Sequence, residues 1–139
     1  MARTRYLVDT SVFARLPKPS VAAAFAPLAA EGLVGLCAPV MFELGYSARS
    51  PQDYQAVAER LSSFPVIATT DGDHVRALAL QALLAVESQH RALSLVDGLV
   101  AAVAESRDLV VLHYDADFEL VARITGQAHE WIVDRGTAD

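Results

Sequence analysis

Short apolar segments alternate with longer segments of mixed polarity along almost the whole chain. The apolar segments predict strands at 5–9, 33–37, 65–68, 109–113 and 130–133. The longer segments predict helices at 11–16, 21–31, 39–49, 52–63, 73–89, 94–107 and 117–125. Short strands that alternate with helices predict an α/β fold with a mostly parallel sheet of four to five strands. The apolar run at 109–112, LVVL, is typical of a strand covered on both faces.

Several residues mark the ends of the predicted helices. Ser20 can cap the helix at 21–31, and Gly32 is placed to end it. Thr70 or Asp71 can cap the helix at 73–89. The apolar residues of that helix follow the 3.6-residue period of an amphipathic helix. They are Val75, Leu78, Ala79, Ala82, Leu83 and Val86.

Length and composition predict one globular domain over residues 1–139. The chain is 53% hydrophobic and 20% charged, which argues for a folded protein rather than a disordered one. No apolar run reaches the roughly 18 residues of a membrane span, so we expect no membrane association. Basic residues at the N-terminus meet Asp9 before the core of a signal peptide could form. Cys37 is the only cysteine, which excludes an internal disulfide and favours a cytoplasmic location.

The charge balance limits the kinds of partner. The formal net charge is −6, from 11 basic and 17 acidic residues. An acidic protein is a poor candidate for a broad nucleic-acid surface, because phosphate binding depends mainly on Lys and Arg. A nuclease is still possible, since bound divalent metals reverse the charge of a pocket. A basic protein partner is also compatible with this charge.

Two predicted strands run directly into acids. Asp9 ends the strand at 5–9, directly after Tyr6-Leu7-Val8, and Asp115 follows the strand at 109–113. In open α/β sheets, ligands bind at the carboxyl ends of the strands. If these two strands are neighbours, the two carboxylates lie close together and repel each other unless a cation compensates. A divalent cation such as Mg²⁺, which prefers oxygen ligands, would do so.

Each acid also has a structural explanation. Asp9 can cap the helix at 11–16, and Asp115 can cap the helix at 117–125. Asp97 follows Ser94 at the spacing of a capping box, S-x-x-D. Glu43 can be a solvated helix residue, although its neighbours in the sequence are mostly apolar. These explanations hold motif by motif, so only the joint arrangement of the acids favours a site.

That joint arrangement resembles a known family. The sequences VDTSVF at 8–13, FELGYSAR at 42–49, LSLVDGLVAA at 93–102 and HYDADFELVARITG at 113–126 together resemble the PIN domain. More narrowly, they are similar to the VapC-type toxins of bacterial toxin–antitoxin pairs. The final HEWIVDRG at 129–136 is also similar to the tail of that subfamily, so the resemblance covers nearly the whole chain.

The resemblance implies a metal-dependent ribonuclease of PIN-like fold. Asp9, Glu43, Asp97 and Asp115 match the acidic quartet of the family. In this interpretation Asp9, Asp97 and Asp115 hold Mg²⁺ or Mn²⁺, and Glu43 orients or deprotonates the attacking water. RNA would be the substrate, and its phosphodiester bond would be cleaved by that metal-activated water.

The same resemblance implies supporting residues and partners. Asp117 matches an accessory acid, and Thr10 or Ser11 matches a hydroxyl that supports the pocket. A small cognate antitoxin of the VapB type would inhibit the enzyme, and a homodimer is expected. The helices at 21–30 and 52–64 could supply the dimer surface.

Two other functions remain as alternatives. The first is a PIN-like module that has lost catalysis and only binds a protein. The second is an aspartate phosphotransfer domain, suggested by the Asp-x-Asp spacing of Asp115 and Asp117. Lys18 is the only lysine and lies in a proline-flanked turn, so it is a poor candidate to steady a phosphoryl group. Arg15 and Lys18 could also line the cleft of the predicted site, and His113 is expected to be a hydrogen-bonded core histidine.

Overall fold

The computed structural model describes residues 3–139. Within this range, five parallel strands form one sheet in the order β3-β2-β1-β4-β5. The strands are β1 (Tyr6–Val8), β2 (Val34–Cys37), β3 (Val66–Ile67), β4 (Val110–His113) and β5 (His129–Trp131). The predicted α/β fold with a parallel sheet is therefore confirmed.

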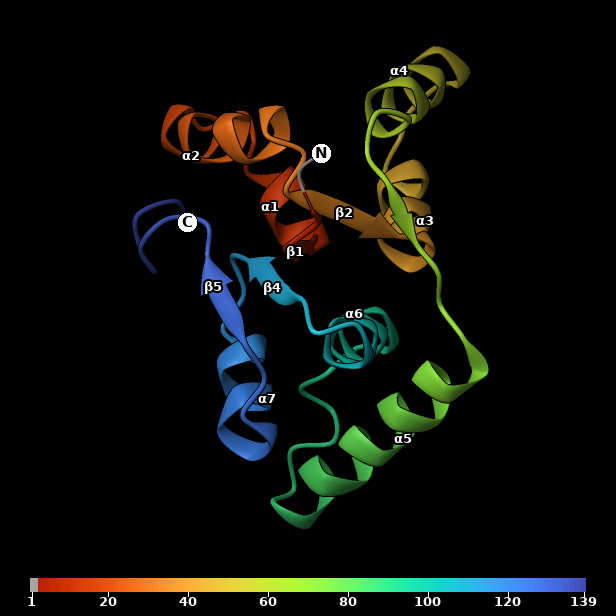
Figure 1. Cartoon of the computed structure of the whole chain (residues 1–139), viewed down its shortest axis with the longest axis vertical. Helices are drawn as coiled ribbons and strands as arrows, with labels where there is room; N and C mark the ends of the chain where they lie inside the picture. Colours follow the sequence, from red (N-terminus) through yellow and green to blue (C-terminus); the bar gives the residue numbers. More distant parts are fainter. Residues whose placement is uncertain (1–2) are drawn as a thin grey trace.

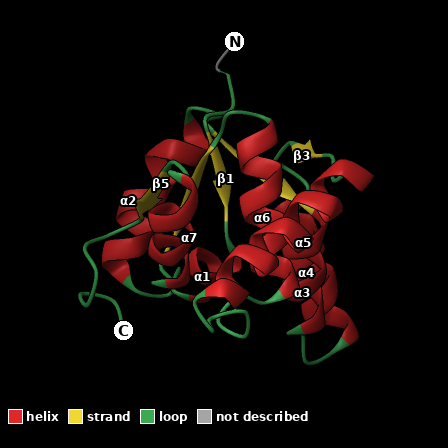
Figure 2. Ribbon diagram, turned by 90° about the horizontal axis from the view of Figure 1, so that it is seen from below, coloured by secondary structure: helices red, strands yellow, loops and turns green. Residues whose placement is uncertain are grey.

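Seven helices of the described chain surround this sheet. They are α1 (Thr10–Ala14), α2 (Pro19–Ala30), α3 (Ala38–Tyr46), α4 (Pro51–Leu61), α5 (Asp71–Val86), α6 (Leu95–Ser106) and α7 (Asp117–Thr125). In Figure 1, α1 and α2 lie on one side of the sheet, and α5, α6 and α7 lie on the other. Figure 2 shows the strands enclosed among the helices. The chain leaves β1 towards β2 and returns to β4 on the opposite side of β1, so the strand order reverses between β1 and β4.

The core is centred on β1, β2 and α6. Every residue of β1 and β2 is buried, as the continuous apolar sequences of these strands require. Helix α6 contacts both β1 and β4 and is covered by α5 on its other side. All of its residues from 98 to 104 are buried. A helix enclosed in this way must be apolar around its whole circumference, which explains the sequence GLVAAVA.

The predicted caps are partly correct. Ser20 does not cap α2, because the helix begins one residue earlier at Pro19 and its N-cap, Lys18, makes no side-chain cap bond. Proline suits the first helical position because its φ is already fixed near the helical value, so the helix starts there. Thr70, rather than Asp71, caps α5 and forms a complete capping box with Asp73. The predicted end of α2 is confirmed, since Gly32 follows the helix with a φ of +70°.

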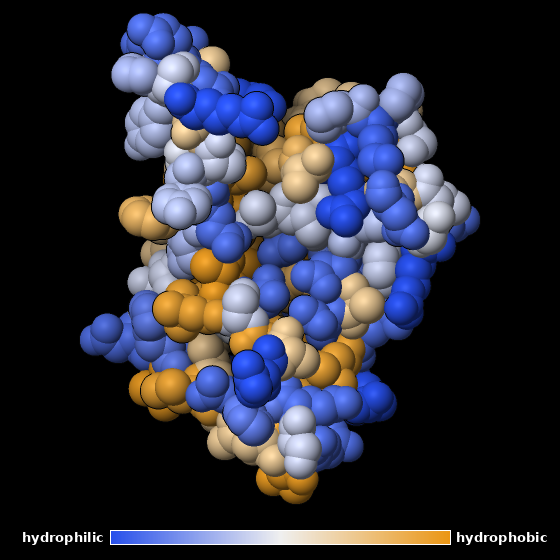
Figure 3. Space-filling view, turned by 180° about the vertical axis from the view of Figure 1, so that it is seen from behind, coloured by the Kyte–Doolittle hydropathy of each residue, from blue (hydrophilic) through white to orange (hydrophobic). Residues whose placement is uncertain are grey.

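The apolar stripe predicted for α5 points away from the core. All six of its residues are exposed, including Val75 at 67% and Val86 at 84%. The helix instead packs through Ala77, Leu80 and Leu84. Because α5 is apolar on more than one face, the period alone did not identify the buried one. Figure 3 shows apolar surface on the lower half of the molecule, yet no helix within residues 3–139 is long and apolar enough to cross a membrane.

Candidate metal centre

Asp9 and Asp115 lie at the carboxyl ends of adjacent strands. Strands β1 and β4 pair in parallel, with Val8 opposite Leu112. The backbone N–H of Asp9 extends this ladder by donating to the carbonyl of Leu112 at 2.9 Å. The two acids therefore leave the sheet side by side, at the point where the strand order reverses. This is the position where ligands bind in open α/β sheets.

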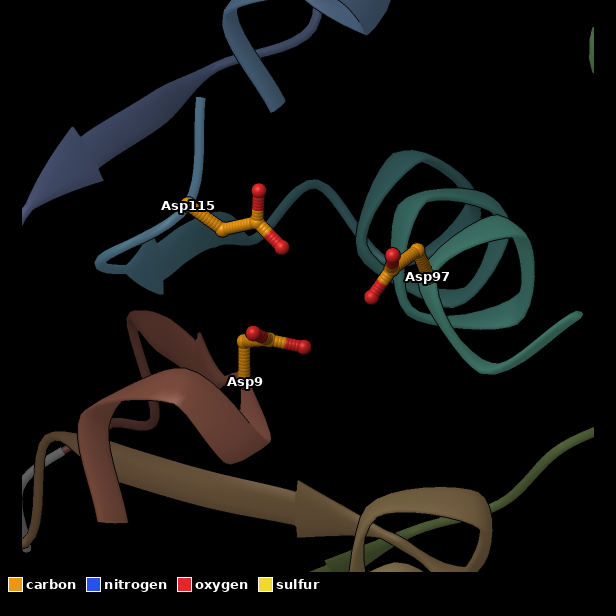
Figure 4. Close-up of side chains that lie close together, drawn as sticks. All are labelled: Asp9, Asp97 and Asp115. Atoms are coloured by element: carbon orange, nitrogen blue, oxygen red, sulfur yellow. The ribbon is translucent and has the colours of Figure 1, made fainter. Parts of the chain in front are cut away.

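Asp97 comes to the same place from the first turn of α6. Its backbone N–H donates to the Oγ of Ser94, the N-cap, at 3.1 Å. One carboxylate oxygen from each of Asp9, Asp97 and Asp115 lies within 4.8 Å of the others. Figure 4 shows the three carboxylates around a common space. One comes from the end of β1, one from the first turn of α6 and one from the segment after β4. The structure thus brings together three acids that are more than 100 positions apart from first to last.

Burial and mutual repulsion act on these carboxylates. Asp9 is 2% exposed, and burial raises its pKa despite hydrogen bonds from Ser11. Burial also raises the pKa of Asp97 to about 7, and the negative charges of Asp9 and Asp115 add to this effect. At an effective dielectric constant of 20, two unit charges at such separations repel by about 3 kcal/mol. Ionising all three acids therefore requires compensating positive charge.

One oxygen of this group has no partner. Asp9 Oδ2 accepts the N–H of Ser11 at 3.0 Å, whereas Asp9 Oδ1 is buried and accepts no hydrogen bond from residues 3–139. An unsatisfied buried carboxylate oxygen is costly in a folded protein. Three convergent carboxylates, one with an orphan oxygen, fit a hard divalent cation, because Mg²⁺ and Mn²⁺ prefer oxygen ligands. Asp9, Asp97 and Asp115 are the residues that could hold it.

Glu43 does not belong to this group of three. It lies on α3, and its Oε1 accepts the hydroxyl of Thr10 at 2.6 Å. Since Thr10 directly follows Asp9, the bond fixes the Glu43 carboxylate next to the strand end that carries Asp9. The sequence alone linked the four acids only through the family resemblance. The structure separates them into three that converge and one that is held beside them.

The other predicted residues lie around the centre. The Oγ of Ser11 accepts the N–H of Tyr114 at 2.8 Å and so ties α1 to the segment after β4. Asp117 starts α7, and its N–H donates to Asp115 Oδ1 at 2.9 Å. Burial and the neighbouring Asp115 raise the pKa of Asp117. Thr10, Ser11 and Asp117 thus hold site residues in place rather than joining the three close carboxylates.

Two hydrogen-bonded histidines, His113 and His129, lie next to Asp115, and the sequence predicts only the first of them. His113 is a buried, hydrogen-bonded histidine, as expected. Its Nδ1 accepts the backbone N–H of Asp115 at 3.0 Å, so its proton is on Nε2, which donates to His129 Nδ1 at 2.8 Å. Burial, with a smaller effect of His129, lowers the pKa of His113 to about 3, so this ring is neutral. No sequence pattern indicated His129, because the contact depends on the pairing of β4 with β5.

Comparison with known proteins agrees with this geometry. The sequence profile of the PIN domain matches residues 6–124. The chain is 48% identical to Ribonuclease VapC51 of Mycobacterium tuberculosis over 97% of this chain and 98% of that protein. It is 40% identical to Ribonuclease VapC21 of the same species, over 97% and 99%.

Solved structures show the same fold. DNA-bound VapBC from Salmonella typhimurium matches with a TM-score of 0.76 at 24% identity, over 94% of this chain and 100% of that chain. VapBC-1 from nontypeable Haemophilus influenzae matches with a TM-score of 0.76 at 15% identity, over 94% and 100%. The match of the family profile over most of the chain, together with relatives at 40% identity and above, shows that this protein belongs to the PIN domain family.

Proposed function

We propose that this protein is a metal-dependent endoribonuclease and the toxin of a toxin–antitoxin pair. The observation that carries the proposal is the convergence of Asp9, Asp97 and Asp115, with an orphan oxygen on Asp9. Relatives at 48% and 40% identity are named ribonucleases, which supports RNA as the substrate. A catalytically inactive binding module would not need three carboxylates that repel one another, so that alternative does not explain the site.

In the proposed mechanism, Asp9, Asp97 and Asp115 would hold Mg²⁺ or Mn²⁺. When bound, such an ion would polarise the scissile phosphate and lower the pKa of a water molecule. Glu43 receives the proton of the attacking water, because its carboxylate stands beside the three acids without being one of them. Thr10 holds Glu43 through its hydroxyl, and the N–H of Asp117 holds one oxygen of Asp115.

We also propose a small antitoxin and a second copy of the chain as partners. The similar structures from Salmonella typhimurium and Haemophilus influenzae are VapBC assemblies. Large apolar side chains are exposed on α3, α4 and α5 of this chain, and such surfaces commonly bind other proteins. They include Phe42, Tyr46, Tyr54, Val75 and Val86.

The test is RNA cleavage by the wild type, Asp9→Asn and Asp53→Asn in Mg²⁺. Asn keeps the shape of Asp9 but removes the charge of a proposed metal ligand, so Asp9→Asn should lose cleavage and keep a native circular dichroism spectrum. Asp53→Asn changes an exposed aspartate in the first turn of α4 and should cleave normally. Wild-type cleavage by Asp9→Asn would refute the mechanism.

Calorimetry with Mn²⁺ separates the enzyme from a docking module. The wild type should bind the ion, and Asp9→Asn should bind it much more weakly. Absence of carboxylate-dependent binding in the wild type would favour the docking module instead. Mapping the ends of RNA cleaved after controlled expression would then identify the target.

A further inference from the structure

A polar cavity of about 480 Å³ adjoins the candidate metal centre. Asp115 lines this cavity as well as belonging to the group of three acids. The other walls come from the end of α1, the segment after β4 and the chain that follows β5. Figure 1 shows this last segment returning from β5 towards α1 and α2. The cavity contains two arginines, Arg15 and Arg135, in a protein whose net charge is −6.

Arg15 is held in a fixed orientation without an ion pair. Its Nε donates to the carbonyl of Ala138 at 3.2 Å, and its Nη1 donates to the carbonyl of Ser11 at 3.3 Å. The guanidinium also lies over the ring of Tyr114, 4.5 Å from its centroid. No carboxylate within residues 3–139 forms a salt bridge with Arg15. Its positive charge therefore borders the cavity without a salt bridge from residues 3–139.

Arg135 is the more accessible of the two arginines. Its side chain is 61% exposed, and its Nη1 pairs with Glu119 Oε2 at 3.1 Å. The guanidinium lies 5.7 Å from the centre of the Trp131 ring. In the described part of the chain only Nη1 of Arg135 has a protein partner, so the N–H groups on its Nε and Nη2 are available to a ligand.

The wall that carries Arg135 is anchored rather than loose. The hydroxyl of Tyr114 accepts the N–H groups of Gly136 and Ala138, each at 2.9 Å. The same hydroxyl donates to Asp139 Oδ1 at 2.8 Å, which holds this acid on the wall but leaves its charge in place. The other acid of the cavity is Asp115, whose charge a cation in the candidate metal centre would neutralise, so the two arginines would then face one uncompensated acid.

We propose that this cavity binds a backbone phosphate of the RNA strand, next to the phosphate that is cleaved. The proposal rests on the proposed nuclease function. An RNA strand that places one phosphate at Asp9, Asp97 and Asp115 carries further phosphates on both sides. A guanidinium binds phosphate through paired hydrogen bonds. The guanidinium groups of Arg15 and Arg135 line the same cavity as Asp115, the acid that the cavity shares with the candidate metal centre. The cavity would thereby position the strand without contacting the cleaved bond.

Trp131 allows this cavity to be observed directly. It is the only tryptophan of the chain, and it lines the cavity. Its fluorescence should change saturably when a random-sequence single-stranded RNA decamer is added in Ca²⁺, which carboxylate oxygens also bind, with gel electrophoresis to confirm that the decamer stays intact. The affinity is measured in parallel from the anisotropy of fluorescently labelled decamer, because replacing Arg135 also alters the surroundings of Trp131.

Arg135→Ala and Arg123→Ala form a matched pair of variants. Both arginines have side chains that are 61% exposed, and each pairs with one glutamate. Arg135→Ala should bind the decamer about tenfold more weakly, the loss expected for one charged phosphate contact. It should also reduce the slope of log affinity against log salt by about 0.7, the value for one phosphate of a single strand. Arg123→Ala should change neither, and Arg135→Lys should keep the salt slope.

Three results would overturn the proposal. The first is an unchanged Trp131 signal when the decamer binds the wild type. The second is an Arg135→Ala variant with the affinity and salt slope of Arg123→Ala. The third is tighter binding of an acidic peptide of equal charge, which would assign the cavity to a protein carboxylate. If the wild type cleaves RNA in Mg²⁺ while any of these results holds, only the cavity proposal fails; absence of cleavage would instead refute the nuclease function.

Discussion

The raised pKa of Asp97 makes a specific prediction about stability. In the folded protein this carboxyl ionises near pH 7, whereas its ordinary pKa is 3.8. The folded state therefore binds a proton that the unfolded chain has already released between these values. The free energy of unfolding must fall as the pH rises from about 4 to about 7. The interval between the two pKa values corresponds to a decrease of about 4 kcal/mol in the free energy of unfolding.

Replacing Asp97 by Asn should remove this loss. In the absence of metal at pH 8, Asp97→Asn should be more stable than the wild type by about 2 to 4 kcal/mol, the lower figure allowing for solvent screening of a partly exposed carboxylate. At pH 4, where Asp97 is protonated in the folded protein, the two proteins should differ little. The gain at pH 8 corresponds to a rise in Tm of roughly 3 °C per kcal/mol for a protein of this size. Urea unfolding in EDTA at pH 4 and pH 8 measures it.

Asp53→Asn is the matched control for this experiment. Asp53 is also three residues after a serine N-cap, whose Oγ accepts the Asp53 N–H at 3.0 Å, but it is exposed and does not belong to the group of three close carboxylates. It should show no gain that grows with pH. Added Mg²⁺ should stabilise the wild type and have little effect on Asp97→Asn, because the ion relieves the same repulsion. Equal or lower stability of Asp97→Asn at pH 8, or a gain that is the same at both pH values, would refute the reasoning.

Two further predictions test the packing. Tyr114→Phe removes the hydroxyl that binds the N–H groups of Gly136 and Ala138, and should cost about 1 to 3 kcal/mol; hydrogen exchange of these two amides should accelerate more than exchange in the sheet, and unchanged exchange would contradict the anchoring role. Leu84→Ala should destabilise the protein by about 2 to 5 kcal/mol because Leu84 is buried, whereas Leu83→Ala on the exposed face should cost less than about 1 kcal/mol. Equal losses in denaturant unfolding would show that the buried face of α5 is assigned wrongly.

The order of strands and helices could be predicted because local sequence determines it. Buried strands such as β4 read as continuous apolar runs, and α7 was predicted at its observed bounds because Gly126 ends it with a φ of +75°. The pairing of β1 with β4 is different in kind. It joins segments about 100 residues apart, and no local signal specifies it. The sequence therefore predicts the convergence of Asp9 and Asp115 only on the condition that β1 and β4 are neighbours.

Contacts between side chains of different elements were the least predictable part. The bond from Thr10 to Glu43 depends on how α1 packs against α3. The bond between His113 and His129 depends on the register of β4 against the edge strand β5. The buried face of α5 could not be chosen because apolar residues occur on both candidate faces. In each case the tertiary packing, rather than the local pattern, selects among arrangements that the sequence permits.

The capping and metal-binding interpretations of Asp9 prove to be compatible. Asp9 is the N-cap of α1 and uses Oδ2 to accept the N–H of Ser11, whereas Oδ1 is buried without a hydrogen bond from residues 3–139. Asp115 is not the N-cap of α7, which is Ala116, but its Oδ1 accepts the N–H of Asp117, the first residue of the helix. These bonds fix the rotamer of each carboxylate before any ion arrives, which reduces the entropy that the ion must overcome. The same rigidity prevents the carboxylates from turning away from one another, so their repulsion persists in the metal-free protein. A backbone hydrogen bond to each of these two acids is thus part of the reason that the site would bind a cation, and the metal-free fold should be the less stable form.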